Sequence, residues 1–310
     1  MRGLAHSKMR GMRKPFLLYW MLAAGLPAGA QTLAGVVDIH VHADPDSMPR
    51  SIDVIDIARL AKERGMRGLV LKNHYEPTAS AAYLVRKEVP GIEIFGGIAL
   101  NRSVGGVNPA AVERMTRVKG GWGRVVWMPT FDAENQVRYS RENRPYVPVS
   151  RDGRLLPEVQ EVLALIARNR LVLATGHSSP EEDLLLIRAG RAAGIRSIVV
   201  THAMLPPVKM SVAQMREAAS LGAYLEFVYN ALIGPNKAFD IREYAAALRA
   251  VGPEHCILSS DLGQAGNPLH PDGLLAFFAA LRQQGFSGQE ISRMAKTNPA
   301  RLLGLTEAAQ

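Results

Sequence analysis

Cysteine is almost absent from this sequence of 310 residues, in which Cys256 is the only one. A disulfide within the chain is therefore excluded, and the fold must depend on a hydrophobic core rather than on covalent cross-links. Aromatic residues make up only 6% of the chain, whereas 47% of its residues are hydrophobic and 21% are charged. These proportions are typical of a folded globular protein and exclude disordered, collagen-like and coiled-coil chains.

Three motifs that mark common classes of enzyme are also missing. No Gly-x-Gly-x-x-Gly turn follows the apolar run over 36–43, and no Gly-x-Ser-x-Gly segment occurs. The glycine pairs Gly96-Gly97 and Gly105-Gly106 are not followed by Gly-Lys-Ser/Thr. These absences argue against a dinucleotide-binding sheet, a phosphate-binding P-loop and a serine nucleophile on a strand-to-helix elbow.

The first thirty residues differ from the rest of the chain. Five basic residues precede an apolar run over 15–30 that ends Ala28-Gly29-Ala30. This layout predicts a secretory signal peptide over residues 1–30, cleaved after Ala30, with a membrane anchor as the weaker alternative because the run is short and interrupted. The mature protein, residues 31–310, is then expected in the periplasm or secreted, without stable membrane insertion.

Loss of this segment changes the charge of the protein. It holds five of the 37 basic residues and no acidic one, so the mature chain, with 28 acidic residues, has a net charge of +4. So small an excess of positive charge does not predict binding to nucleic acid. A small-molecule substrate is the expected partner, and the sequence is silent on oligomeric state.

Short runs rich in Val, Ile and Leu alternate with helical patterns along the mature chain. Eight runs are found, over 36–43, 68–74, 92–100, 124–130, 171–178, 197–203, 223–230 and 256–263. Helices are expected between them, for example over 53–64, 109–116, 155–168, 181–193, 211–221 and 241–250. Apolar strands that alternate with helices predict a parallel sheet covered on both faces, and eight such units favour a single-domain (β/α)8 TIM barrel over an open doubly wound sheet.

One interval between strands is longer than the others and predicts an insertion after the fourth strand. Its first part, residues 131–148, contains Arg138, Arg141 and Arg144. In a barrel this segment would begin at the carboxyl end of the fourth strand, which is the end of the barrel where active sites are located. It is expected to be either a lid with arginines for anions or a solvated loop.

Histidines occur at the carboxyl ends of the predicted strands. In the first run His40 and His42 are two residues apart, so both imidazoles should point to one face, with Ile39 and Val41 facing the helices. His177 ends the fifth run, His202 the sixth, and Asp261 the eighth. These side chains would converge at one mouth of the barrel and supply enough donors for one or two divalent ions such as zinc, manganese or iron.

This pattern resembles the amidohydrolase superfamily of metal-dependent hydrolases, which carry His-x-His on the first strand, His on the fifth and sixth, and Asp on the eighth. The resemblance covers the whole mature chain, including a final segment over 294–304 that is similar to the last helix of that superfamily. It implies that His40, His42, His177 and His202 are metal ligands and that Asp261 is both ligand and general base.

The chain departs from that superfamily at the fourth strand, so it resembles an atypical branch. Binuclear members usually place a carboxylated Lys or a Glu there to bridge two ions, and the run over 124–130 contains no candidate. Lys72 and His74 instead share one face of the second run. Lys72 could bridge as a carbamate, bind substrate as an ammonium, or form an ion pair with Asp38, and His74 is assigned to substrate or metal.

The resemblance implies a metal-dependent hydrolase that attacks an amide, ester, lactone or phosphoester of a small molecule. Asp261 would take the proton from the attacking water, and a metal, His74 or Lys72 would stabilise the oxyanion. Two alternatives stay open: an exported, non-catalytic barrel that binds a metal or metabolite, and a metal-dependent decarboxylase. Further candidates for substrate contact, for which packing or capping is the competing interpretation, are Asn101, Arg102, Trp127, Glu226, Tyr229 and His270.

Overall fold

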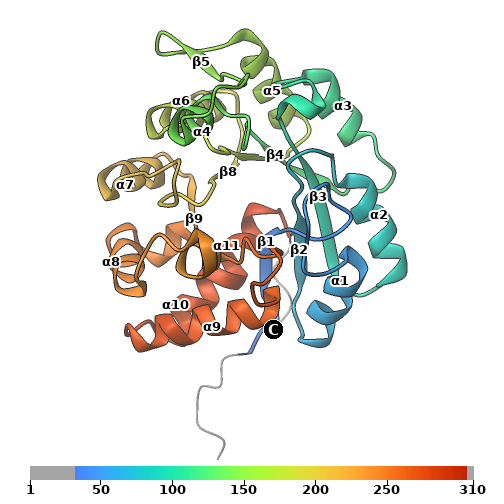
Figure 1. Cartoon of the computed structure of the whole chain (residues 1–310), viewed down its shortest axis with the longest axis vertical. Coiled ribbons are helices and arrows are strands. Elements are labelled where there is room, and N and C mark those ends of the chain that lie inside the picture. Colours follow the sequence, from blue (N-terminus) through green and yellow to red (C-terminus); the bar gives the residue numbers. More distant parts are fainter. Residues whose placement is uncertain (1–31, 306–310) are drawn as a thin grey trace, which may run out of the picture. The chain divides into compact units, whose positions relative to one another are not determined.

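The computed structural model of the chain describes residues 32–305, and the predicted signal peptide lies outside the described residues. Eight parallel strands form one sheet in the order β1-β2-β3-β4-β7-β8-β9-β10, with helices between them (Figure 1). The predicted alternation of strand and helix is therefore confirmed. The strands are β1 (Val37–Val41), β2 (Gly68–Leu71), β3 (Glu93–Ala99), β4 (Gly123–Trp127), β7 (Val172–Ala174), β8 (Ser197–Val200), β9 (Tyr224–Val228) and β10 (Cys256–Ser259).

Helices begin where a residue can accept the unpaired amide hydrogens of the first turn. Ser179, Ser211 and Asp240 each form a reciprocal capping box with the residue three positions later. The helices are α1 (Val54–Glu63), α2 (Ala79–Glu88), α3 (Pro109–Thr116), α4 (Glu134–Ser140), α5 (Pro157–Arg168), α6 (Pro180–Ala192), α7 (Val212–Ser220), α8 (Ile241–Val251), α9 (His270–Gln283), α10 (Gly288–Ser292) and α11 (Asn298–Leu302).

The first and last strands meet just beyond their carboxyl ends and close the sheet into a barrel. Val41 forms a parallel bridge with Leu262. The amide of His42 donates to the carbonyl of Leu262 at 3.0 Å, and the amide of Asp261 donates to the carbonyl of His40 at 3.0 Å. Closure of the barrel thus brings the first and eighth strands together at the residues that the sequence selected as ligands.

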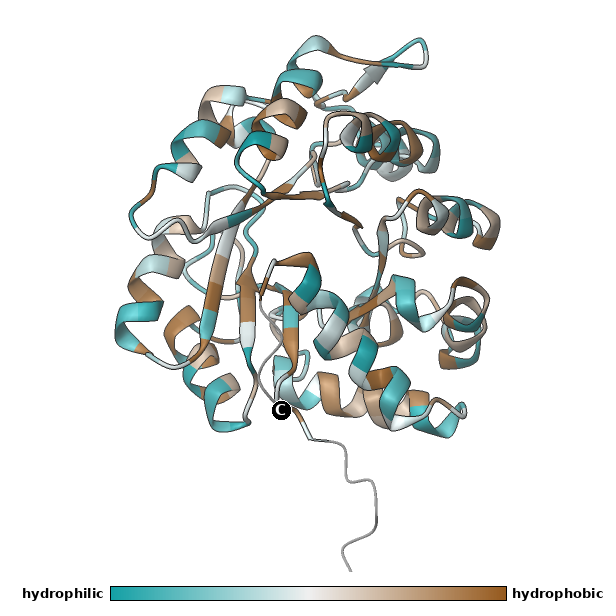
Figure 2. Ribbon diagram, turned by 180° about the vertical axis from the view of Figure 1, so that it is seen from behind, coloured by the Kyte–Doolittle hydropathy of each residue, from teal (hydrophilic) through white to brown (hydrophobic). Residues whose placement is uncertain are grey.

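Two hydrophobic clusters occupy the two faces of the sheet. One contains the helix residues together with strand residues such as Val41, Leu69 and Leu71. The other holds the alternate strand residues, including Val70 and Val125, and fills the barrel interior. Figure 2 shows strands that are mostly hydrophobic, whereas the helices also carry hydrophilic residues.

The first strand departs from regular alternation. Val41 packs with the helices as predicted, but Ile39 packs in the interior cluster, so the prediction for Ile39 was wrong. The register of β1 against β2 shifts between Asp38 and Val41. A shift of this kind breaks the two-residue period, so Ile39 and the histidine that follows it can both lie inside the barrel.

The C-terminal helix α11 lies at the amino end of the barrel. The side-chain amide of Asn298 donates to the carbonyls of Pro253 and Cys256, at the start of β10, at 2.8 and 2.7 Å. Leu302 and Leu303 pack into the interior cluster. This end of the barrel is therefore filled by apolar side chains, and the opposite end is left for polar ones.

The predicted insertion after β4 is present and has its own structure. It contains α4 and a hairpin of β5 (Ser150–Arg151) and β6 (Arg154–Leu155), which turns at Asp152-Gly153. Arg138 pairs with Glu134, and Arg144 pairs with Asp132 and Glu142. Two of the three arginines proposed for anions are thus neutralised within the insertion itself.

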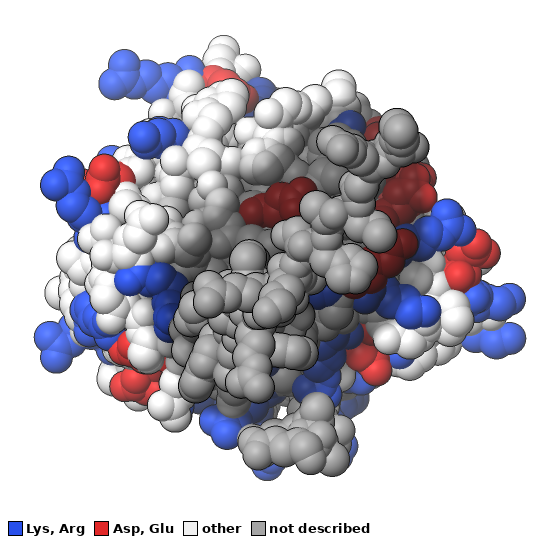
Figure 3. Space-filling view, turned by 90° about the horizontal axis from the view of Figure 1, so that it is seen from below, with Lys and Arg blue, Asp and Glu red and all other residues white. Residues whose placement is uncertain are grey.

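Charges of both signs are mixed on the molecular surface. Basic and acidic side chains lie beside one another on the face seen in Figure 3. Ion pairs also join neighbouring elements, such as Arg64 with Asp272 at 3.1 Å. Within residues 32–305, no helix has both the length and the apolar character needed to cross a bilayer.

Helix α6 buries a carboxyl group on the side that faces the sheet. Asp183 is completely buried, and burial raises its pKa well above the ordinary value of 3.8, with Glu182 and Glu181 adding to the shift. The folded chain therefore holds a proton on Asp183 at pH values where the unfolded chain has lost it.

We expect Asp183→Asn to remove a pH-dependent destabilisation. The pKa is higher in the folded state, so the wild type loses stability as pH rises from about 4 toward the folded pKa, by up to about 1.4 kcal/mol per pH unit for this one group. The variant cannot titrate at this position, so its free energy of unfolding should increase relative to that of the wild type as pH rises. Urea unfolding of both proteins at several pH values measures this difference, and a constant difference would contradict the buried protonated carboxyl.

Candidate metal centre

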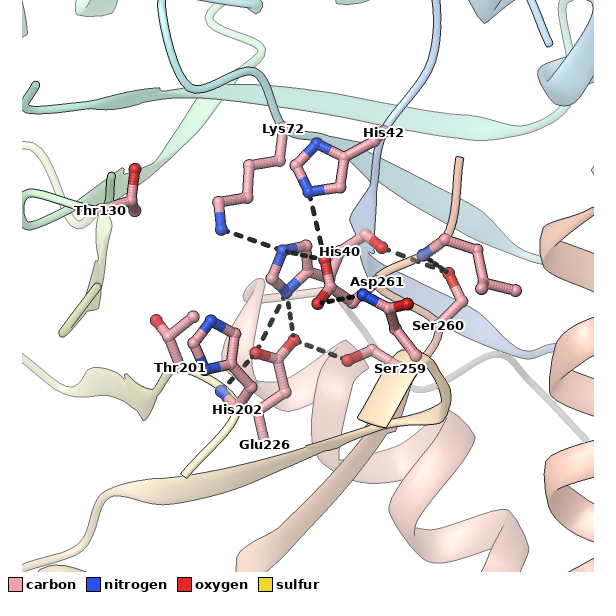
Figure 4. Close-up of polar contacts among 12 residues, drawn as sticks. His40, His42, Lys72, Thr130, Thr201, His202, Glu226, Ser259, Ser260 and Asp261 are labelled. Atoms are coloured by element: carbon pink, nitrogen blue, oxygen red, sulfur yellow. Dashed lines mark hydrogen bonds and ion pairs between the residues drawn. The ribbon is translucent and has the colours of Figure 1, made fainter. Parts of the chain in front are cut away.

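The polar side chains of the barrel gather at the carboxyl ends of the strands, as predicted. His40 and His42 come from β1 and the residue after it, Lys72 and His74 follow β2, His177 follows β7, His202 follows β8, and Asp261 follows β10. All seven are at least nine-tenths buried. We refer to His40, His42, Lys72, His74, His177, His202 and Asp261 as the mouth cluster; five of them are labelled in Figure 4.

Asp261 joins the two histidines of the first strand. Its Oδ1 atom lies 2.9 Å from Nε2 of His40 and 3.1 Å from Nε2 of His42. One potential ligand atom from each of these three residues lies within 4.8 Å of the others. The structure thus brings together a His-His-Asp group that could hold a metal ion.

Glu226 of β9 fixes the orientation of His40. Nδ1 of His40 donates to the Glu226 carboxylate, whose oxygens lie 3.1 and 3.2 Å away. The same carboxylate accepts from the hydroxyl of Ser259 at 2.6 Å and from the amide of His202 at 2.9 Å (Figure 4). Because a carboxylate can only accept, the proton of the neutral ring is held on Nδ1 and the lone pair of Nε2 faces the mouth cluster.

His177 and His202 form a second pair. Their Nε2 atoms are 3.1 Å apart, and the ring of His202 lies 6.0 Å from that of His40, centroid to centroid. Nδ1 of His177 lies 2.8 Å from the side-chain oxygen of Gln136 on α4. The insertion therefore reaches the mouth cluster through a glutamine, not through an arginine.

The contacts at His40 fit a bound cation. Nε2 of His40 lies 2.9 Å from Oδ1 of Asp261 and also 2.9 Å from Nζ of Lys72. One ring nitrogen offers either one hydrogen or one lone pair, so it cannot satisfy both neighbours.

The spacing of the ligand atoms is also suitable. Two atoms that each bind zinc at 2.0–2.1 Å in tetrahedral geometry are about 3.3 Å apart. The separations of 3.1 Å within the pairs His42–Asp261 and His177–His202 are close to this value. The donor set of imidazoles and one carboxylate suits zinc, manganese or iron.

Burial and charge set the protonation of these groups. Burial lowers the pKa of His42 to about 3 and that of His202 to about 4, so both stay neutral. Burial also opposes the charged form of His40, but the carboxylates of Asp261 and Glu226 outweigh it and raise the pKa to about 9. Although burial works in the other direction, His40 and His42 hold the pKa of Asp261 well below 3.8. Metal binding at His40 would therefore release a proton.

Lys72 lies inside the mouth cluster and not beside Asp38. Oδ1 of Asp38 accepts instead from the amides of His40 and Ser260, at 3.2 and 3.0 Å. Nζ of Lys72 lies 5.6 Å from the centre of the Trp127 ring. Burial lowers the pKa of Lys72 to about 8, although Asp261 and Glu226 act in the opposite direction.

His74 lies between the two pairs. Its ring is 4.9 Å from that of His42 and 6.2 Å from that of His177. Nδ1 of His74 is 2.8 Å from the hydroxyl of Thr130, and Phe131 stacks on the ring at 3.8 Å. The segment that leaves β4 thus holds His74 from two sides.

Unusual backbone conformations occur at two residues of the mouth cluster and next to a third. His202 and Asp261 have φ values of 29° and 51°, in the left-handed region that few residues other than glycine adopt. Gly176, with a φ of 70°, precedes His177, and a Cβ atom there would lie 2.3 Å from the carbonyl oxygen of Met128. Only glycine combines this turn with so close an approach to β4.

We expect Gly176→Ala to destabilise the fold and displace His177. A side chain at this φ costs about 1–2 kcal/mol, and the overlap with backbone oxygen adds to that cost. Gly153→Ala is the matched control, because Gly153 has a φ of 72° and a Cβ atom added there would meet no other atom within 4 Å. Thermal unfolding of both variants should show the larger loss for Gly176→Ala, and equal losses would contradict the close approach.

The remaining candidates have structural partners. Trp127 packs inside the barrel, Nε2 of His270 donates to the carbonyl of Leu262 at 2.8 Å, and Glu226 orients His40. Arg102 and Tyr229 make no contact with the mouth cluster among the contacts of the described chain. Asn101 is buried, and its side-chain nitrogen donates to the hydroxyl of Thr130 at 2.6 Å.

Sequence reasoning did not select Thr130 or Gln136. Thr130 ends the fourth apolar run. The criterion that selected the histidines, a polar residue at the carboxyl end of a predicted strand, therefore also applies to Thr130. Gln136 lies on α4, inside the insertion, and nothing in the local pattern connects it with His177. Only the folded position of the insertion could reveal that contact.

The fold is a (β/α)8 barrel that is shared with solved hydrolases. An organophosphorus hydrolase from Deinococcus radiodurans is 18% identical over 89% of this chain and 93% of its own, with a TM-score of 0.60. An amidohydrolase from Pseudomonas aeruginosa is 13% identical over 87% of this chain and 95% of its own, also with a TM-score of 0.60. A mutant of a PTE-like lactonase from D. radiodurans is 18% identical over 89% and 98%, with a TM-score of 0.59.

The chain belongs to a family of unknown function, DUF6282, whose model matches residues 35–226. That span contains the six basic residues of the mouth cluster and Glu226, and it ends before Asp261. No curated protein sequence matches the chain.

Proposed function

We propose that this protein is a metal-dependent hydrolase of the amidohydrolase type that acts on a small molecule. The observation that carries the proposal is the contact of one Asp261 oxygen with Nε2 of both His40 and His42, beside the His177–His202 pair. The solved structures that share the fold include an organophosphorus hydrolase, an amidohydrolase and a PTE-like lactonase, which supports the same class of reaction.

The proposed ligands are His40, His42, His177, His202 and Asp261, for one or two divalent ions, with zinc first and manganese or iron as alternatives. A metal bound there would polarise a water and the substrate oxygen, so that hydrolysis proceeds near neutral pH. In the neutral ring of His40, Glu226 holds the proton on Nδ1, so Nε2 is the nitrogen that offers a lone pair to a metal once the second proton has been released.

Asp261 is the proposed general base. Its pKa is held low, and one oxygen is turned to His40 and His42 while Oδ2 accepts from the side chain of Asn230 at 3.3 Å. Oδ2 is therefore held in a fixed direction, suited to take a proton from the attacking water and to return it to the leaving group.

Lys72 is proposed as the replacement for the bridging ligand that the fourth strand lacks. Its amine is buried 2.9 Å from His40, and its lowered pKa of about 8 leaves part of it neutral at mildly alkaline pH. A neutral amine can react with carbon dioxide to form a carbamate, whose two oxygens could bind two ions. As an ammonium, the same group would bind a substrate oxygen. The mass of the intact protein, measured without acid, distinguishes these states.

The proposal is tested by reconstituting the purified protein, residues 31–310, with zinc or manganese. Initial rates are measured on esters, lactones, amides, phosphotriesters and carboxylic acids. Hydrolysis that depends on metal supports the proposal. Release of carbon dioxide from an acid without hydrolysis would favour a decarboxylase, and tight metal binding with no turnover on any substrate would favour a binding protein.

We also propose that residues 1–30 direct export and are removed, so that the mature protein acts in the periplasm or outside the cell. The basic segment followed by a short apolar run supports this. N-terminal sequencing of protein expressed from the full chain tests it, since the mature protein should begin at Gln31.

A further inference from the structure

We propose that Thr130 and Asn101 hold His74 with its proton on Nε2, so that His74 donates a hydrogen bond to a substrate oxygen and does not bind the metal. This inference rests on the proposed hydrolase function and assigns a definite role to a residue that the sequence left between substrate and metal. Thr130 and Asn101 act as positioning residues, because they contact His74 and not the reacting atoms.

The orientation of the Asn101 side chain is fixed by the backbone. Its oxygen accepts from the amides of Thr130 at 2.8 Å and Asp132 at 3.1 Å. Its nitrogen must then be the donor, and it donates to the carbonyl of His74 at 2.7 Å and to the hydroxyl oxygen of Thr130 at 2.6 Å. Asn101 is completely buried, so no solvent competes with these bonds.

The hydroxyl of Thr130 therefore receives one hydrogen and has one to give. Thr130 is completely buried, and its remaining contact in the described chain is Nδ1 of His74 at 2.8 Å. If the hydroxyl donates to Nδ1, the side-chain amide of Asn101, the hydroxyl of Thr130 and Nδ1 of His74 all have partners. If Nδ1 carried the proton instead, the buried hydroxyl hydrogen would have no acceptor, which is unfavourable.

A neutral imidazole with a lone pair on Nδ1 carries its proton on Nε2. Nε2 of His74 makes no hydrogen bond to any residue within 32–305, and Phe131 stacks on the ring and fixes its plane. The edge that remains free is thus an N–H group. It cannot offer a lone pair to a metal, but it can donate to a carbonyl or phosphoryl oxygen as negative charge develops there.

The other histidines of the mouth cluster have the opposite arrangement. Nδ1 of His40 faces the Glu226 carboxylate, and Nδ1 of His177 faces the side-chain oxygen of Gln136. The Gln136 nitrogen donates to Ser140 at 2.8 Å, which sets that oxygen toward His177. Acceptors therefore hold the Nδ1 protons of two ligands, whereas a donor faces Nδ1 of His74.

The direct test is the tautomer of His74 in the metal-loaded protein. Imidazole ¹⁵N–¹H correlation spectra, with His74 assigned by its loss in His74→Gln, should show a protonated Nε2 and an unprotonated Nδ1. A proton on Nδ1 of His74 would overturn the proposal. This measurement does not need a substrate, so it stands even if the proposed hydrolase activity is not found.

Variants separate the role of His74 from that of a ligand. His74→Gln should keep the metal content of the wild type and lower kcat by about 10²–10³-fold, the usual effect of losing one oxyanion donor. The matched control, His177→Gln, should lose metal. Loss of metal from His74→Gln to the same extent would show that His74 is a ligand.

Thr130→Val and Thr130→Ser test the positioning network. The valine variant has the same shape without the hydroxyl, so the His74 spectrum should show a mixture of tautomers, and kcat should fall about tenfold with KM and metal content unchanged. The serine variant should restore the Nε2–H tautomer and most of kcat. A wild-type tautomer in Thr130→Val would contradict the role assigned to the hydroxyl.

Discussion

Replacing Asp261 by Asn is expected to lower kcat/KM by about 10²–10⁴-fold, because the amide cannot accept a proton from the attacking water. The same change removes the charge that raises the pKa of His40 to about 9, so His40 should bind metal with less competition from protons. It also removes one charged ligand. Rates are therefore measured at saturating metal, with metal content determined on the same samples.

Asp183→Asn is the matched control for this experiment. Asp183 is as deeply buried as Asp261, and its raised pKa favours the protonated, neutral carboxyl, which an amide matches in shape and charge. This variant should keep the wild-type rate. A rate within tenfold of wild type for metal-loaded Asp261→Asn would remove Asp261 from the role of general base.

Removing the metal is expected to abolish turnover and to lower the melting temperature by about 8–16 °C. A ligand present at a thousand times its dissociation constant stabilises the folded state by about 4 kcal/mol. Each kcal/mol corresponds to about 2–4 °C in a protein of this size. Without a cation, Nε2 of His40 faces both Oδ1 of Asp261 and Nζ of Lys72 and cannot satisfy both.

Dialysis against a chelator, followed by addition of zinc, measures this effect by thermal unfolding. In the double variant His40→Ala/His42→Ala the shift should disappear, whereas His255→Ala, a change outside the mouth cluster, should keep it. Elemental analysis of the reloaded proteins gives one or two ions per chain. A chelator that leaves both the melting temperature and the metal-dependent rate unchanged would contradict the metal centre.

Much of the barrel could be read from the sequence because its elements are locally encoded. The eight apolar runs became the eight strands, since a strand covered on both faces must be apolar throughout. The six helices expected between them are present as α1, α3, α5, α6, α7 and α8. The prediction for Ile39 was wrong because the register shift depends on how β1 pairs with β2, and the local sequence pattern does not encode that pairing.

Selecting polar residues at the carboxyl ends of predicted strands identified the residues of the mouth cluster but not the residues that orient them. His40, His177 and His74 each receive an orienting contact from another element, namely β9, α4 and the end of β4. Glu226 was expected to pack or to contact substrate, and Thr130 and Gln136 were not selected. Their contacts join residues 41 to 186 positions apart, a separation that sequence patterns do not encode.

The sequence by itself determined the barrel and the residue types that its mouth would hold, because hydrophobic periodicity and strand ends are properties of short segments. The tertiary structure alone decided how those side chains are protonated and aimed. Closure of the barrel placed Asp261 against His40 and His42, and the insertion placed Gln136 on His177. Tautomer and pKa depend on the nearest donor or acceptor in space, and only the folded chain defines that neighbour.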